Sequence, residues 1–241
     1  MKAIILAAGI GKRLQPLTLS IPKPLIKIGR KEILSYQLDY LLDNGITNFV
    51  IATGLFHEKI ENYVKENYSD IRVTFVYNPI YKKTNYIYTL WLTKEYIDDD
   101  ILLLHGDLIF NKILLKKLVD FDKNGVLVSK KIKGLEKDFK AIISNERVVK
   151  IGVDVRGENA YTCMPMYKLR KEDFLLWLNK IEEFIKRGKT NLYAEDVLNE
   201  LTDKIWIYPV YFTNELCMEI DIREDIEKAE KAMENKKWTK K

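Results

Sequence analysis

The chain has 241 residues, of which 47% are apolar, 31% charged and 11% aromatic. With 11 glycines and 6 prolines, it does not have the composition of a collagen-like, linker-rich or disordered chain. The net charge of +5 is the small difference between 40 basic and 35 acidic side chains, so it gives no argument for nucleic-acid binding. At roughly 150 residues per domain, the length fits one large α/β domain or two small ones.

Cysteine content and apolar runs indicate the compartment. Cys163 and Cys217 lie far apart, with no CxxC spacing, which disfavours a disulfide framework or a structural zinc site. The apolar stretch at residues 3–8 is shorter than the roughly 7–15 residues of a signal peptide. No run approaches the ~18 apolar residues of a membrane-spanning helix. We therefore expect a cytoplasmic protein without membrane insertion.

In the first half of the chain, short apolar runs alternate with amphipathic stretches. The runs predict buried strands at residues 3–6, 49–52, 73–76 and 101–104. Apolar residues at helical spacing predict helices at residues 33–42 and 57–68. This alternation predicts a parallel sheet covered by helices.

From residue 126 the strand-like runs become shorter and are separated by turns. They predict an antiparallel elaboration with strands at residues 126–129, 141–144, 148–151 and 161–167. Further on we expect helices at 171–186, 194–201 and 225 to about 234, and a strand at 205–212. The predicted fold class is a Rossmann-like, three-layer α/β/α domain over residues 1–241. Its mixed sheet is mostly parallel, with an inserted β segment at about 130–165.

The most informative motif follows the first predicted strand and reads L-A-A-G-I-G-K-R-L from Leu6. Gly9 and Gly11 let backbone N–H groups approach an anion, while Lys12 and Arg13 add charge and donors. The pattern predicts a polyphosphate-binding loop. It is neither a Walker A motif nor a complete GxGxxG, and taken alone it fits a tight turn after a strand equally well.

A second motif, P-K-P-L, begins at Pro22. Its two prolines stiffen the backbone and fix the direction of Lys23. A lysine held in this way near a phosphate loop suits a cation directed at a phosphoryl group under attack. The alternative is a rigid surface loop with a solvated lysine.

Together, L-A-A-G-x-G-x-R-L and P-K-P-L resemble the nucleotidyltransferase superfamily that makes activated sugars and alcohols. The resemblance implies that the glycine loop holds a nucleotide triphosphate. It also implies that Lys23 contacts the α-phosphate and that Arg13 faces the departing pyrophosphate. The nucleotide-binding residues that it implies are Leu6, Ala7, Ala8, Gly9, Gly11, Lys12, Asn85 and Gly106.

Two aspartates suggest a metal site. Asp107 ends the fourth predicted strand, at the carboxyl edge of a parallel sheet where ligands bind. Asp221 lies just before the last predicted helix, where it is either a metal ligand or the helix N-cap. Mg²⁺ on a nucleotide is typically held by one or two protein carboxylates. The resemblance implies that Asp107 and Asp221 hold Mg²⁺.

One segment narrows the choice within the superfamily. Residues 78–90 read N-P-I-Y-K-K-T-N-Y-I-Y-T-L, similar to the N-x-x-Y…N-x-x-S/T-L pattern of bacterial choline-phosphate cytidylyltransferases. Residues 192–196 and 219–221 also look like that subgroup. The resemblance implies transfer of CMP from CTP to a phosphate or phosphonate acceptor, with release of pyrophosphate. The alternatives are a hexose-1-phosphate uridylyl- or thymidylyltransferase and a non-catalytic nucleotide-binding module.

For the acceptor site, we predict Lys140, Tyr193 and Glu195. A quaternary ammonium group prefers aromatic faces backed by a carboxylate, which Tyr193 with Glu195 offers, although Tyr193 equally fits a core position. Lys140, in a D-F-K segment similar to the D-M-K of some relatives, suits the acceptor's phosphate or phosphonate. The tryptophan that choline enzymes carry near this point is absent, so phosphocholine, phosphoethanolamine and aminoethylphosphonate stay open. We expect no nucleic-acid partner, and the assembly is either a monomer or a homodimer.

Overall fold

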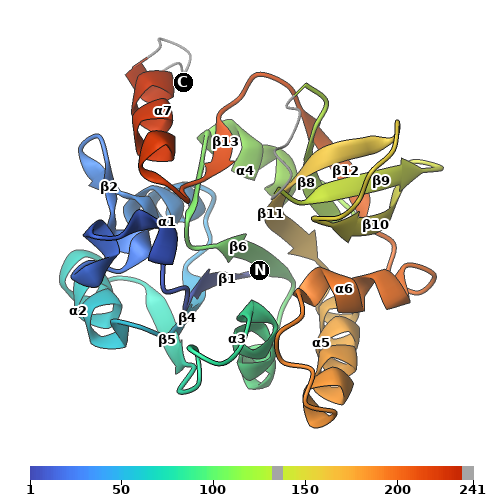
Figure 1. Cartoon of the computed structure of the whole chain (residues 1–241), viewed down its shortest axis with the longest axis horizontal. Helices are drawn as coiled ribbons and strands as arrows, with labels where there is room; N and C mark the ends of the chain where they lie inside the picture. Colours follow the sequence, from blue (N-terminus) through green and yellow to red (C-terminus); the bar gives the residue numbers. More distant parts are fainter. Residues whose placement is uncertain (132–137, 235–241) are drawn as a thin grey trace.

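The computed structural model describes residues 1–131 and 138–234, and its main feature is one nine-stranded mixed sheet (Figure 1). The strands run in the order β10-β9-β11-β6-β1-β4-β5. In addition, β8 pairs with β11, and β12 pairs with β8. The strands of this sheet are β1 (Lys2–Ala7), β4 (Asn48–Thr53), β5 (Arg72–Tyr77), β6 (Ile101–His105), β8 (Gly125–Ser129), β9 (Lys140–Ser144), β10 (Arg147–Gly152), β11 (Ala160–Leu169) and β12 (Tyr208–Phe212). The helices are α1 (Ile33–Asp43), α2 (His57–Asn67), α3 (Tyr86–Leu92), α4 (Lys112–Val119), α5 (Lys171–Lys186), α6 (Ala194–Leu198) and α7 (Arg223–Glu234).

Strand β1 lies at the centre of the parallel half of the sheet. All of its residues are buried, and Ala3 pairs with Phe49 of β4 on one side and Leu102 of β6 on the other. A strand covered on both faces is apolar along its centre, which is why residues 3–7 have no polar alternation. The predicted parallel sheet is confirmed.

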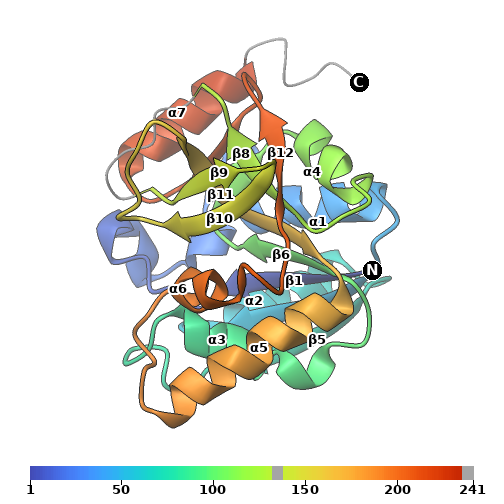
Figure 2. The same ribbon diagram turned by 90° about the vertical axis from the view of Figure 1, so that its right-hand side faces the viewer.

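Helices cover both faces of this half. Because side chains alternate along a strand, Ile4 and Leu6 contribute to a core with α3, α5 and α6. Ala3, Ile5 and Ala7 point the other way, into a core with α1, α2 and α4. Figure 2 shows α5 and α6 on one side of β1 and β6, with α4 on the other. The predicted three-layer α/β/α arrangement is confirmed.

Strand β11 begins the antiparallel half. It runs antiparallel to β6, with Met166 opposite Leu104, and also pairs with β8 and β9. The predicted antiparallel elaboration is therefore confirmed. Most of the predicted insert at 130–165 lies here, and its residues 132–137 lie outside the described residues.

Some boundaries differ from the sequence analysis. The strand expected at 205–212 begins at Tyr208, and the last helix begins at Arg223. The helix expected at 194–201 ends at Leu198 and continues as a 3₁₀ turn, Asn199–Leu201. Helices α3 and α4 were not expected from the sequence. Neither were two short antiparallel pairs, which are β2 (Lys27–Ile28) with β3 (Lys31–Glu32) and β7 (Leu108–Phe110) with β13 (Cys217–Glu219).

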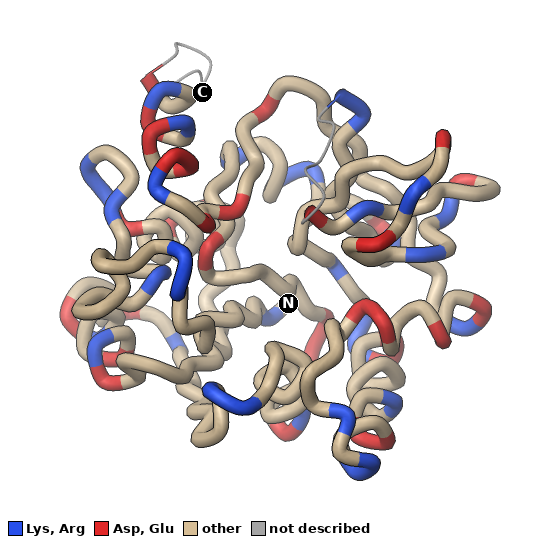
Figure 3. The backbone as a smooth tube through the Cα atoms, in the orientation of Figure 1, with Lys and Arg blue, Asp and Glu red and all other residues tan. Residues whose placement is uncertain are grey.

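The β7–β13 pair determines where the C-terminal part of the chain lies. Met218 lies opposite Ile109 in an antiparallel register, so the segment after residue 217 is held beside the end of β6. Within the described ranges, no helix combines the length and apolarity needed to cross a membrane. Basic and acidic positions are distributed together around the molecule, in keeping with the small net charge (Figure 3).

Candidate functional site

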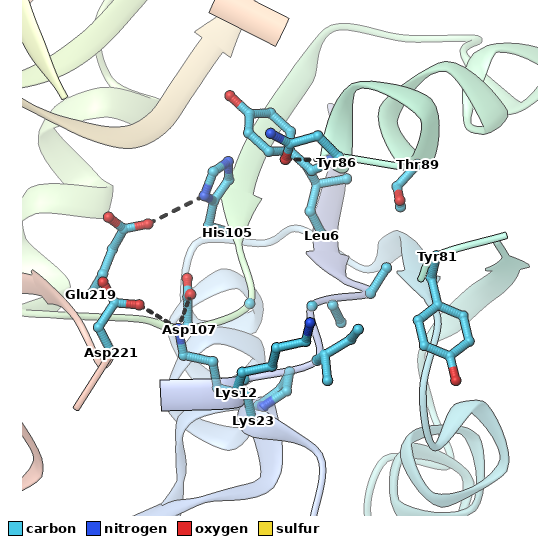
Figure 4. Close-up of a pocket in the computed structure, with 18 of the residues that line it drawn as sticks. Leu6, Lys12, Lys23, Tyr81, Tyr86, Thr89, His105, Asp107, Glu219 and Asp221 are labelled. Carbon is cyan, nitrogen blue, oxygen red and sulfur yellow. Dashed lines mark hydrogen bonds and ion pairs between the residues drawn. The ribbon is translucent and has the colours of Figure 1, made fainter. Parts of the chain in front are cut away.

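A cavity of about 480 Å³ opens at the carboxyl ends of β1 and β6 (Figure 4). Ligands bind at this edge in parallel α/β sheets. Most residues predicted to form the site line this cavity. They are Leu6, Ala7, Ala8, Gly9, Gly11, Lys12, Arg13, Lys23, Asn85, Gly106, Asp107, Tyr193 and Asp221. The sequence motifs therefore meet in one place.

The glycine loop forms one wall of the cavity. Gly11 has a φ of 67°, and a Cβ atom there would lie 2.9 Å from Thr18 Cγ2. Thr18 is almost fully buried and donates a hydrogen bond from Oγ1 to the Gly11 carbonyl, at 2.8 Å. Both the backbone conformation and the close packing therefore require glycine at this position. Around Gly9 there is open space, so no contact within the chain requires a glycine there.

Lys23 lies on the floor of the cavity. Pro22 is extended, and the chain then makes a single 3₁₀ turn, Lys23–Leu25, which differs from a fully extended P-K-P segment. Lys23 is only 9% exposed, so the alternative of a solvated surface lysine is wrong. Its Nζ donates to Asp107 Oδ2 and, at 2.9 Å, to Asp221 Oδ1.

The two carboxylates keep Lys23 charged. Burial alone would lower the pKa of the amine, but Asp107 and Asp221 outweigh burial and raise it above its usual value. Gly106 makes this arrangement possible, because a Cβ atom there would lie 2.9 Å from the Leu6 carbonyl oxygen and 3.2 Å from Pro24 Cγ. The lysine turn can thus pack closely against the ends of β1 and β6.

Asp221 lies between two cations. Its Oδ1 is 2.9 Å from Lys23 Nζ and 2.9 Å from an Arg13 guanidinium nitrogen. Asp225, in the first turn of α7, accepts hydrogen bonds at Oδ2 from the N–H groups of Asp221 and Ile222, at 3.0 and 3.1 Å, which fixes the backbone just before the helix. The Asp221 side chain, paired with the two cations, lines the cavity.

The carboxylates present fit a divalent cation. Asp107 Oδ1 is buried and has no hydrogen-bond partner among the described residues, and a cation, the Lys23 amine, already lies between Asp107 and Asp221. Hard oxygen donors of this kind suit Mg²⁺. Asp107 also belongs to a second group with His105 and Glu219, whose ligand atoms lie within 4.8 Å of one another. Asp107 is thus common to the Asp107–Asp221 pair and to this second group.

The part of the cavity that adjoins these carboxylates is aromatic and acidic. His105 Nδ1 lies 3.3 Å from Glu219 Oε1 (Figure 4). The ring of Tyr86 lies 4.9 Å from that of His105 and 6.1 Å from that of Tyr193, and Tyr193 is 5.1 Å from Phe139. Burial raises the pKa of the Glu219 carboxyl, and a hydrogen bond with His105 opposes that shift. We call these five residues the aromatic–acidic end.

Several residues of the cavity were not selected from the sequence. They include Tyr81, Tyr86, Thr89, His105, Phe139 and Glu219. His105 is the last residue of β6. His105 and Glu219 each lie two positions before one of the predicted metal-binding aspartates, and this shared spacing is the sequence signal that could have indicated them.

Lys140 and Glu195 lie apart from the cavity lining. Lys140, at the start of β9, donates from Nζ to the Asp138 carbonyl at 2.9 Å. Glu195 is 1% exposed, and its carboxyl accepts from the hydroxyls of Tyr86 and Tyr167. Their predicted contact with the acceptor stays a prediction, as do the ligand contacts of the residues that line the cavity.

Asn85 places the start of α3 at the cavity. Its Oδ1 accepts a hydrogen bond from the Tyr86 N–H at 2.7 Å, which makes it the N-cap of the helix. Its own N–H donates to the Thr190 carbonyl at 2.9 Å, joining α3 to the segment before α6. Asn85, predicted to bind the nucleotide, therefore also links α3 to the segment before α6.

The chain is similar to known proteins in sequence and in fold. The model of the family described as "Nucleotidyl transferase" matches residues 2–136. The choline-phosphate cytidylyltransferase of Streptococcus pneumoniae is 42% identical over 95 residues, which cover 39% of this chain and 40% of that protein. The enzyme of the same name from Haemophilus influenzae is 26% identical over 227 residues, covering 93% of this chain and 94% of the relative.

A solved structure extends the likeness to the whole fold. The CTP:phosphocholine cytidylyltransferase of Streptococcus pneumoniae superposes with a TM-score of 0.79 at 24% identity, over 97% of this chain and 99% of that one. The superposition supports the α/β architecture, and the family model covers the glycine loop, the P-K-P-L motif and Asp107. The resemblance stated from the sequence is confirmed. The chain belongs to the nucleotidyl transferase family.

Proposed function

We propose that the protein is a CTP-dependent cytidylyltransferase, which transfers CMP to a small acceptor carrying both a phosphate or phosphonate and a cationic group. One observation carries the proposal: a single cavity joins the Lys23–carboxylate cluster to the aromatic–acidic end. The Lys23–carboxylate cluster suits a nucleotide triphosphate with its metal, and the aromatic–acidic end suits an alkylated or protonated amine. The relatives reported above are named as cytidylyltransferases, which supports CTP as the donor.

The nucleotide binds along the glycine loop. Backbone N–H groups from Gly9 to Arg13 and the side chain of Lys12 contact its phosphates. Arg13, which reaches Asp221 in the free protein, turns to the departing pyrophosphate. The base lies toward Ala7 and Ala8, with Asn85 and Gly106 nearby.

The reaction is an in-line displacement at phosphorus. An oxygen of the acceptor's phosphate or phosphonate attacks the α-phosphorus of CTP, the bond from that phosphorus to the bridging oxygen breaks, and pyrophosphate leaves. This oxygen is already nucleophilic at neutral pH, so no general base is required. Lys23 stabilises the charge that develops on the α-phosphate, and its position on rigid backbone orients it without further movement.

Asp107 and Asp221 would hold Mg²⁺, which supplies charge neutralisation to the phosphates when bound. Glu219 and His105 lie on the acceptor side of the same carboxylate cluster. This arrangement brings the donor's phosphates and the acceptor's phosphate to adjacent sites.

The aromatic–acidic end discriminates between classes of acceptor. Ring faces and edges from Tyr86, Phe139 and Tyr193, together with the Glu219 carboxyl, attract a cation that is weakly hydrated. A hexose needs several polar partners for its hydroxyl groups. The composition of this end therefore favours a cationic acceptor over a hexose 1-phosphate.

A matrix assay tests the function. CTP, UTP, dTTP and ATP are each combined with phosphocholine, phosphoethanolamine, aminoethylphosphonate and glucose 1-phosphate, and pyrophosphate release is measured. We expect release with CTP and a cationic acceptor. Activity confined to sugar phosphates would establish the uridylyl- or thymidylyltransferase alternative. Nucleotide binding without release in any combination would instead support a binding module. Homodimer formation stays a prediction, which sedimentation velocity tests.

A further inference from the structure

Glu195 is a buried carboxyl behind the aromatic–acidic end. It lies in the first turn of α6, is 1% exposed and does not line the cavity. Tyr86 of α3 donates its hydroxyl to Glu195 Oε2, and Tyr167 of β11 donates to Oε1 at 2.8 Å. A buried carboxyl is costly unless it is hydrogen-bonded, and here each oxygen has a partner. The carboxyl thus joins three elements that are far apart in the sequence.

Tyr86 connects this carboxyl to the cavity. Its ring lines the cavity and lies 4.9 Å from His105 and 6.1 Å from Tyr193. The hydroxyl at the far end of the ring is bound to Glu195, so the ring is held at both ends of the side chain. The hydroxyl oxygen of a tyrosine lies on the axis of ring rotation, so this hydrogen bond fixes the position of that axis and with it the first side-chain torsion.

Helix α6 is a fixed support for Glu195. The Trp177 indole N–H donates to the Ala194 carbonyl at 3.0 Å, and Trp177 is fully buried. At the other end, Asn199 accepts from the Ile151 N–H at 2.8 Å and donates to the Ile151 carbonyl at 2.7 Å. The short helix is therefore anchored to α5 and to β10.

We infer that Glu195 is a positioning residue: it acts through the Tyr86 hydroxyl to hold that ring at the acceptor end and does not touch the acceptor. The inference rests on the proposed function, which assigns the aromatic–acidic end to the acceptor. It replaces the direct contact that the sequence suggested for Glu195. Affinity for the acceptor then depends on a residue outside the cavity.

Steady-state kinetics with CTP and phosphocholine, or whichever acceptor of the matrix is used best, test the inference. Glu195→Leu removes both carboxyl oxygens that accept hydrogen bonds, and Tyr86→Phe removes the hydroxyl but keeps the ring. We expect each to raise the acceptor KM about tenfold, the effect of one lost hydrogen bond, with the KM for CTP unchanged within about twofold. Glu195→Gln keeps one side-chain oxygen that can accept a hydrogen bond from Tyr86, so its KM for the acceptor substrate should lie close to that of wild type. Combining Glu195→Leu with Tyr86→Phe should be no worse than the larger single effect.

Tyr167→Phe is the matched control. It removes a hydroxyl from the same carboxyl, yet Tyr167 does not line the cavity, so the acceptor KM should stay within about twofold of wild type. An equal rise in Tyr167→Phe, additive effects of Glu195→Leu and Tyr86→Phe, or an unchanged KM in Glu195→Leu would each overturn the inference.

A measurement without turnover separates this inference from the proposed function. In protein labelled with 3-fluorotyrosine, the Tyr86 ¹⁹F resonance is assigned by its loss in Tyr86→Phe. We expect it to shift or broaden in Glu195→Leu and to stay in place in Tyr167→Phe. An unmoved resonance in Glu195→Leu overturns the inference. Absence of turnover with every acceptor, accompanied by the expected shift, overturns only the proposed function.

Discussion

Lys23 Nζ and Asp221 Oδ1 are 2.9 Å apart although 198 positions separate them in the chain. The same amine also contacts Asp107, so one buried cation connects the first, middle and last parts of the sequence. These carboxylates are the proposed metal ligands, which means that Lys23 and the metal act on one shared cluster. Changes to any of the three residues are therefore expected to affect catalysis before they affect the fold.

Asp107→Asn tests the metal assignment. The amide keeps the shape of the side chain but loses the charge that a divalent cation needs. We expect kcat to fall roughly 10²–10³-fold, the range seen when a single electrostatic stabiliser is removed, and the Mg²⁺ concentration for half-maximal activity to rise. Pyrophosphate release over a Mg²⁺ titration measures both. The thermal unfolding midpoint controls for folding, and an unchanged Mg²⁺ dependence would contradict the assignment.

Glu219→Gln tests the charge of the acceptor end. Loss of the carboxylate should weaken attraction for a cationic acceptor, so its KM should rise about tenfold while the KM for CTP stays constant. The rise should be similar for phosphocholine and phosphoethanolamine, since both carry one positive charge. Glu215→Gln, which changes a carboxylate that pairs with Lys117 away from the cavity, is the matched control. Equal KM values for Glu219→Gln and wild type would contradict a role of this charge.

Stability should depend on pH through Glu195. Burial raises the pKa of this carboxyl from the usual value of 4.5 to about 8. Below about pH 4.5 it is protonated in both states, and between these values only the folded state retains the proton. The free energy of unfolding therefore falls as pH rises through this window, by at most about 1.4 kcal/mol per pH unit, and levels off above pH 8.

Glu195→Gln isolates that contribution, because the amide does not titrate. Urea unfolding of both proteins at pH 5, 6, 7 and 8 should show the variant gaining stability relative to wild type as pH increases. The difference between the two proteins is the quantity of interest, since the other titrating groups are common to both. Parallel pH profiles would show that Glu195 is ionised throughout the range.

Gly11→Ala and Gly9→Ala form a matched pair in the phosphate loop. Gly11 has a positive φ, and a Cβ atom there would meet Thr18, so its replacement should lower stability by roughly 1–3 kcal/mol. A Cβ atom at Gly9 meets no atom of the chain within 4 Å, so stability should be nearly unchanged. Both should raise the KM for CTP, because the nucleotide passes close to the loop. Unchanged CTP binding in Gly9→Ala would contradict close contact between the nucleotide and the loop.

The parallel half of the fold could be predicted from sequence for a simple physical reason. Strands such as β1 are buried on both faces, so their apolar runs stand out from the surrounding chain. The helix α3 lacked such a signal, because residues 86–92 are largely apolar or aromatic and show no polar face. Its N-cap, Asn85, was identified only as part of a family motif.

The nucleotide half of the cavity follows from local motifs, whereas the acceptor half does not. Gly11 and Lys23 belong to short patterns whose chemistry can be recognised locally. Glu219 reaches the cavity through the pairing of β7 with β13, two strands of three residues each. Strands this short are not distinguished from loops by periodicity. Burial of Glu195 depends likewise on packing between α3, α6 and β11, which no local pattern encodes.

The pairing of β13 with β7 also sets an order of events during synthesis. A nascent chain that has emerged only as far as α6 has the glycine loop, Lys23 and Asp107, but its reactive centre lacks Asp221 and Glu219. Until those residues arrive, the Lys23 amine has one carboxylate instead of two. The proposed metal site is thus completed only after nearly all of the sheet can form, and a chain interrupted before then would carry the glycine loop without the full set of proposed metal ligands.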